Sequence, residues 1–197
     1  MGNTILDERY KELLRQVYEI LKPLGYKKEA SNFRQIYKGG LGKILNFQKS
    51  KWNTNNEIQF VLNAGVYFEK ENVIQNFRFK ESECQIRKRV NGNDSWWVIN
   101  ESTDMEKLYE SVKNSLAMIL DLFSVFTDKE TTIELILNEK ANSYSDITIM
   151  HYRNAKLLTD MGYAREVYEL IKDSNAKFLA ELAKEISLRS NEKLTSS

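Results

Sequence analysis

Apolar and polar residues alternate in the middle of the chain, between residues 43 and 97. In the run 58–68 every even position is apolar, as shown by Ile58, Phe60, Leu62, Ala64, Val66 and Phe68. Because successive side chains of a strand point to opposite faces, this period of two predicts a strand with one apolar face. The runs 44–52 and 83–90 predict two further strands, and in the latter Cys84, Ile86, Lys88 and Val90 share one side.

Short polar segments separate these runs. Residues 53–56 predict the loop of an antiparallel hairpin, and the Asn-Gly turn at 91–94 connects the third strand to a fourth at 96–100. An earlier hairpin is predicted over 27–37, with its turn at 30–32. The glycines of 39–42 then predict a tight turn, because a phosphate-binding glycine loop joins a strand to a helix.

A helical spacing of apolar residues replaces the alternation at both ends of this region. Residues 6–22 and 105–126 each place one apolar stripe along a helix. Pro23 and Gly25 end the first helix, and Thr103 with Glu106 predicts a capping box for the second. Further helices are predicted over 129–142, 145–161 and 164–188, with a break of the last near 174–175 as an alternative.

Together these elements predict an α+β protein. It has a mostly antiparallel sheet of five to six strands, with an N-terminal helix and a long helix packed on it, followed by a C-terminal helical extension. The predicted division is an α+β domain over 1–126, a helical hairpin over 127–189 and a disordered tail over 190–197.

The composition favours a soluble, cytoplasmic protein. The chain has 197 residues, of which 42% are hydrophobic and 29% charged. No apolar run approaches the roughly 18 residues of a membrane span, and the N-terminus lacks the pattern of a signal peptide. The single cysteine excludes an internal disulfide. We therefore expect no membrane partner.

Charge is unevenly distributed along the chain. Residues 1–100 hold 17 basic and 11 acidic side chains, whereas residues 101–197 hold 12 and 17, and the total is +1. One interpretation is that the basic half meets an anionic partner. The other is that the two halves complement each other.

The strongest candidate for chemistry is one polar face of the predicted sheet. Amide, hydroxyl and guanidinium groups on this face suit a protein or an anionic ligand, and nucleic acid is a further candidate partner. The alternative interpretation is that the face is the solvated outer side of the sheet. The candidate binding residues are Asn46, Gln48, Ser50, Asn63, Tyr67, Gln85, Arg87 and Arg89.

No set of residues predicts catalysis. Cys84 alternates with apolar neighbours and is about seventy positions from His151, the only histidine, so a buried, inert thiol is predicted. One cysteine and one histidine do not make a zinc site. We therefore assign no catalytic residue, metal or cofactor. The enzyme hypothesis that stays open is a phosphodiester-directed activity that uses Gln48, Glu83, Arg87 and Arg89.

Several motifs together resemble a bacterial family catalogued only as a domain of unknown function. They are LKPLGY at 21–26, NFQKSKW at 46–52, NxGVYF at 63–68, ECxIRxR at 83–89 and WW at 96–97. The resemblance covers about residues 6–126 and implies an antiparallel sheet with a helix packed on it, without catalytic residues. The leading hypothesis is thus a non-enzymatic binding or protein-interaction module, by fold-level analogy similar to small immunity proteins.

Overall fold

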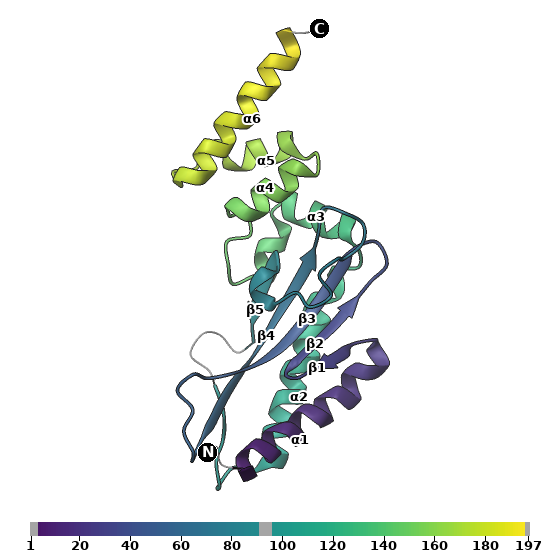
Figure 1. Cartoon of the computed structure of the whole chain (residues 1–197), viewed down its shortest axis with the longest axis vertical. Coiled ribbons are helices and arrows are strands. Elements are labelled where there is room, and N and C mark those ends of the chain that lie inside the picture. Colours follow the sequence, from purple (N-terminus) through teal and green to yellow (C-terminus); the bar gives the residue numbers. More distant parts are fainter. Residues whose placement is uncertain (1–3, 91–95, 196–197) are drawn as a thin grey trace.

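A single antiparallel sheet organises the protein, with helices on one of its faces and a helical extension at one end (Figure 1). The computed structural model describes residues 4–90 and 96–195. This arrangement confirms the predicted α+β class.

The sheet has the strand order β1-β2-β3-β4-β5, and β6 also pairs with β4. All pairings are antiparallel. The central strand β4 is the longest, so its outer edge holds β5 along one half and β6 along the other. The strands are β1 (Lys27–Glu29), β2 (Asn32–Ile36), β3 (Leu41–Lys49), β4 (Ile58–Phe68), β5 (Ile86–Arg89) and β6 (Trp97–Ile99).

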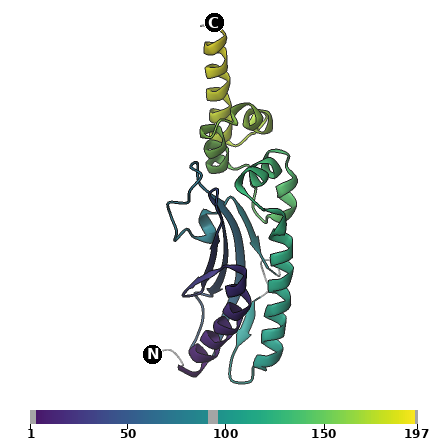
Figure 2. The ribbon, with the colours of Figure 1, turned by 90° about the vertical axis from the view of Figure 1, so that its right-hand side faces the viewer.

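Two helices, α1 (Thr4–Leu21) and α2 (Met105–Leu122), pack on one face of the sheet, which we call the helix face. Figure 2 shows α2 running along the sheet. The even-numbered side chains of β4 point to it and are buried, as the pattern of period two predicted. The Tyr10 ring lies 5.2 Å from the Phe60 ring, and its hydroxyl donates to the Phe47 carbonyl at 2.7 Å. Burial of this face supplies most of the hydrophobic core.

Residues 69–85, which connect β4 to β5, fold over part of the opposite face and are called the covering loop. Ile74, Phe79 and Cys84 of this loop pack against Ile44 and Tyr67 of the sheet in a small apolar cluster. The Tyr67 and Phe79 rings stack with centroids 4.4 Å apart. The rest of this face carries polar side chains and is called the polar face.

A buried lysine fixes the start of the covering loop. Lys129 Nζ donates to the carbonyls of Lys70 and Glu71, both at 2.8 Å, and to Asn72 Oδ1 at 3.1 Å. Burial lowers the pKa of this lysine. Because three acceptors surround the ammonium group, the loop is held against α3 (Lys129–Leu137).

The helical extension follows α2 and stacks on one end of the sheet, with the last helix projecting away from it (Figure 1). Its α-helices are α3, α4 (Tyr152–Asp160), α5 (Ala164–Ile171) and α6 (Lys177–Thr195), with a 3-10 helix η4 (Lys140–Tyr144) after α3. The helix predicted at 145–161 thus begins at Tyr152, and the one predicted at 164–188 is two helices, in agreement with the alternative of a break near 174–175.

Three local predictions need correction. The strand predicted at 83–90 begins only at Ile86, because the 3-10 turn η2 (Glu81–Glu83) precedes it. Cys84 therefore packs in the small cluster between the covering loop and the sheet, whereas Ile86 and Val90 lie in the main core. At the start of α2 the cap is Asp104, whose carboxylate accepts from two backbone amides, so the predicted capping box is absent.

The predictions for two turn regions have different outcomes. The predicted hairpin at 27–37 is present as the β1–β2 pair. The predicted Asn-Gly turn at 91–94 lies outside the described residues. Beyond it, β6 pairs with β4 at Ile58–Phe60.

Candidate binding groove on the polar face of the sheet

A row of polar side chains crosses four strands of the polar face. Strand pairing places Asn32 of β2 opposite Asn46 of β3, Asn46 opposite Asn63 of β4, and Asn63 opposite Arg89 of β5. Directly paired residues of an antiparallel sheet point to the same face, so these side chains are neighbours. Gln48 and Arg87, two positions along their strands, lie on the same face.

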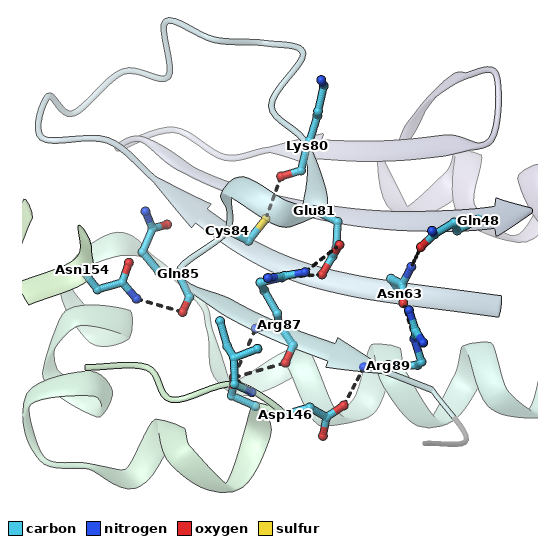
Figure 3. A network of polar contacts seen from close by, with 12 residues as sticks. Gln48, Asn63, Lys80, Glu81, Cys84, Gln85, Arg87, Arg89, Asp146 and Asn154 are labelled. Atoms are coloured by element: carbon cyan, nitrogen blue, oxygen red, sulfur yellow. Dashed lines mark hydrogen bonds and ion pairs between the residues drawn. The ribbon is translucent and has the colours of Figure 1, made fainter. Parts of the chain in front are cut away.

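Hydrogen bonds join these side chains in two groups, Asn32 with Asn46 and Gln48 with Asn63 and Arg89, which together we call the ladder. Figure 3 shows the second group. Asn46 Nδ2 donates to Asn32 Oδ1 at 2.8 Å, and Asn63 Nδ2 donates to Gln48 Oε1 at 2.8 Å. Asn63 Oδ1 in turn accepts from Arg89 Nε at 3.0 Å. The guanidinium carbon of Arg89 lies 5.7 Å from the centroid of the Trp96 ring. These contacts fix the side-chain orientations before any ligand binds.

Arg87 is oriented by the covering loop. Its Nε donates to Glu81 Oε1 at 2.6 Å and its Nη2 to Glu81 Oε2 at 3.4 Å, with the Arg87 side chain 33% exposed and the Glu81 side chain 15% exposed. The two-pronged contact matches the fork of a guanidinium to a carboxylate. It therefore ties β5 to the covering loop at the rim of the polar face.

Arg34 anchors the other side of the loop and is itself buried. Its Nε donates to the Phe79 carbonyl at 2.8 Å, and its Nη1 to Glu29 Oε2 at 3.0 Å. Glu29 also pairs with the exposed Arg78 at 3.1 Å. Since all three Arg34 nitrogens have protein acceptors, the residue serves mainly to hold the loop.

The loop and the sheet together enclose a groove with a volume of about 780 Å³, which we call the polar groove. Five basic and two acidic side chains line it, so its lining carries a net charge of +3. The lining residues are Glu29, Ala30, Asn32, Arg34, Asn46, Gln48, Arg78, Lys80, Glu81, Ser82, Arg87 and Arg89.

The structure brings together five of the eight predicted site residues, Asn46, Gln48, Asn63, Arg87 and Arg89. Tyr67 points to the same face but lies under the covering loop against Phe79. Ser50 lies beyond the end of β3, where its hydroxyl accepts from the Trp52 amide. Gln85 precedes β5 and is buried. Its Oε1 accepts from the amide of Phe68, the last residue of β4. Ser50 and Gln85 therefore lie outside the groove lining.

Sequence reasoning missed three of the five basic residues of the groove, namely Arg34 and the pair Arg78 and Lys80 on the covering loop, which we call the basic wall. Arg34 shares its face with Asn32 through the β2 alternation, and extending the register across the predicted first hairpin would have found it. Arg78, Lys80 and Glu81 sit on the covering loop, where no periodicity signals their direction. Their position depends on the tertiary anchors of the loop.

Cys84 and Glu83, the two side chains considered for chemistry from the sequence, do not line the groove. Cys84 is 3% exposed, its Sγ contacts the Lys80 carbonyl at 3.6 Å, and burial raises the pKa of its thiol. Glu83, named in the enzyme hypothesis, accepts from the Lys80 amide at 2.6 Å and does not line the groove. Within residues 4–90 and 96–195, no group of three His, Cys, Asp or Glu side chains could hold a metal ion.

The helical extension supports the far edge of the groove. The Asp146 amide donates to the Arg87 carbonyl at 2.8 Å, and its carboxylate accepts from the Arg89 amide at 2.7 Å and Lys88 Nζ at 2.6 Å (Figure 3). Asn154 Nδ2 donates to the Gln85 carbonyl at 3.1 Å. The outer edge of β5 is thus occupied by the extension, which fixes the backbone that carries both groove arginines.

Comparison with known proteins gives one match, to a family model. No curated protein and no solved structure matches the chain. None of the described helices combines the length and apolarity that crossing a membrane requires. A family model matches residues 17–125, more than half of the chain, from within α1 to the end of α2 and its following 3-10 turn. The chain therefore belongs to the DUF4304 family, a domain of unknown function.

Proposed function

We propose that this protein is a non-enzymatic binding module that takes an anionic partner in the polar groove. The observation that carries the proposal is the collection of five basic side chains in one groove, three from strands and two from the covering loop. Arginine forks and amide donors are suited to carboxylate or phosphate groups.

The geometry supports a preorganised surface. Asn63 connects Gln48 to Arg89, and Glu81 orients Arg87, so the row across β3, β4 and β5 loses little conformational entropy on binding.

The wall of the groove is more accessible than this row. Lys80 and Arg78 stand there, and the Arg78 side chain is 82% exposed. An ion pair as exposed as that between Arg78 and Glu29 contributes little stability, so an anionic partner can compete for the guanidinium group.

The test is retention on immobilised heparin, a generic polyanion, over a salt gradient. Arg78→Ala/Lys80→Ala removes two groove charges without touching the ladder. Lys156→Ala/Lys172→Ala is the matched control, since it removes two charges from ion pairs of the helical extension. We expect the groove variant to elute earlier, with a salt dependence lower by about two ionic contacts. The control should elute with wild type.

Equal losses in the two variants would show that retention follows net charge and not the groove. That result, or a wild-type protein that is not retained at all, would overturn the proposed function.

A further inference from the structure

A second groove continues the first across the sheet. It has a volume of about 640 Å³ and shares Glu29, Arg34 and Arg78 with the polar groove. Its other lining residues include Lys27 and Lys28 of β1. The two grooves therefore adjoin at Glu29, Arg34 and Arg78, and together we call them the channel. The channel reaches from β1 to β5, which are four strand spacings apart, or about 19 Å. The combined lining has seven basic and two acidic side chains.

The β1 end of this channel is apolar as well as basic. Phe77, on the covering loop, is 63% exposed, and Ile36 at the end of β2 is 38% exposed. An exposed aromatic ring beside an exposed aliphatic side chain forms a small anchor for an apolar group of a partner.

The two carboxylates in the channel discriminate between classes of anion. Glu29 lies where the two grooves meet, and Glu81 lies near the β5 end beside Arg87. A nucleic-acid strand carries a phosphate at every nucleotide and would bring charges close to both carboxylates. A polypeptide can place acidic side chains opposite the arginines and neutral ones opposite Glu29 and Glu81.

On this basis we propose that the channel binds an extended, acidic segment of another protein, with an apolar side chain at the Phe77 and Ile36 end. The inference rests on the proposed function and specifies its partner. An extended chain advances about 3.3 Å per residue, so about six residues cross the channel, with alternate side chains facing the sheet.

The experiment compares two fluorescent probes of equal charge by anisotropy. One is an amidated peptide with a leucine followed by four Glu-Gly repeats, labelled at its N-terminus. The other is a five-nucleotide oligothymidylate, which has four phosphodiesters. We expect the peptide to bind at least about tenfold more tightly, in keeping with the charge pattern. Arg78→Ala/Lys80→Ala should abolish most of this binding, and Lys156→Ala/Lys172→Ala should not change it.

Phe77→Ala tests the apolar end. We expect it to weaken peptide binding about fivefold, as the loss of one apolar contact, without changing binding of a peptide that lacks the leucine. Val73→Ala is the matched control, since Val73 is 59% exposed on the same loop and does not line the channel. Equal peptide binding by Phe77→Ala and wild type would overturn the apolar end of the inference.

The outcomes separate the two proposals. Tighter, groove-dependent binding of the oligothymidylate would overturn the acidic-segment inference and leave the proposed function standing. Binding of neither probe, with groove-dependent heparin retention intact, would also overturn the inference alone. Loss of groove dependence on heparin would overturn the proposed function itself.

Discussion

The two faces of the sheet satisfy their side chains in opposite ways. On the helix face, Phe47 and Phe60 are fully buried among aromatic and aliphatic neighbours. On the polar face, Asn46 and Asn63 bond to other side chains of the same face and leave a groove beside them. Residues adjacent in sequence, such as Asn46 and Phe47, thus contribute separately to a surface and to the core.

The Trp96-Trp97 pair shows the same division within two positions. The Trp97 ring stacks on Phe60, with centroids 5.5 Å apart, and so belongs to the helix face. Trp96 lies against the Arg89 guanidinium at the groove end. Stability should therefore depend on the helix face and partner binding on the polar face, and substitutions can test this division.

The largest loss of stability is expected from Phe60→Ala on the helix face. The ring is fully buried and contacts the rings of Tyr10, Phe47 and Trp97, so its removal leaves a cavity at the centre of the core. We expect a decrease of about 3–5 kcal/mol in the free energy of unfolding, measured by urea denaturation. A decrease below about 1 kcal/mol would contradict the assignment of this face as the main core.

A smaller loss of stability is expected from Gly65→Ala. Gly65 lies under the covering loop, where the packed interior adjoins the binding surface. A Cβ at this position would lie 2.5 Å from Cys84 Sγ and 2.7 Å from Cys84 Cβ. The overlap should cost about 1–3 kcal/mol and displace the loop that carries the basic wall. Cys84→Ala in the same chain should restore part of the stability, because it removes the sulfur. An unchanged unfolding midpoint in Gly65→Ala would show that the loop is not closely packed.

Asp146→Ala tests the support that the helical extension gives to the groove. The substitution removes acceptors for the Arg89 amide and the Lys88 ammonium group. We expect a loss of about 1 kcal/mol and faster hydrogen exchange at the Arg89 amide. Asp160→Ala, which removes an exposed ion pair of α4, is the control. Equal exchange at Arg89 in both variants would rule out this supporting role.

The smallest effect is expected from Asp7→Asn, at the margin of the helix face. A hydrogen bond from Lys49 and its positive charge lower the pKa of the Asp7 carboxyl. The stabilisation is therefore present above the unfolded pKa of 3.8 and is lost as the pH falls through the lower folded value. The Asp7 side chain is 41% exposed and the Lys49 side chain 39% exposed, so solvent screens the pair. For a pair this accessible we expect a stabilisation of about 0.5 kcal/mol or less at neutral pH.

Urea denaturation of wild type and Asp7→Asn at a series of pH values measures this difference. The two curves should converge under strongly acidic conditions. A gap that persists there would mean that the carboxylate charge is not the source of the stabilisation.

The sequence predicts the sheet well where one face is continuously buried. The alternation in 58–68 places Phe60 in the core and Asn63 on the polar face, because burial specifies the register of β4. The same argument places Arg87 and Arg89 correctly, since they lie within β5.

The prediction fails where tertiary contacts redirect the chain. Cys84 and Gln85 follow a 3-10 turn, and their directions are set by Tyr67, Phe79 and the edge of β4. The basic wall on the covering loop has no pattern of its own. Its position is set by Arg34 and Lys129, which are distant in sequence from the residues they hold.

The proposal with the widest consequence is that the protein binds its partner in the polar groove. The most direct test is an amide NMR titration of the labelled protein with the leucine-terminated Glu-Gly peptide. We expect the changes in amide chemical shift to concentrate in residues 27–36, 77–82 and 86–89, and Arg78→Ala/Lys80→Ala to remove them. Shifts confined to the helical extension, or equal shifts in the groove variant, would contradict it.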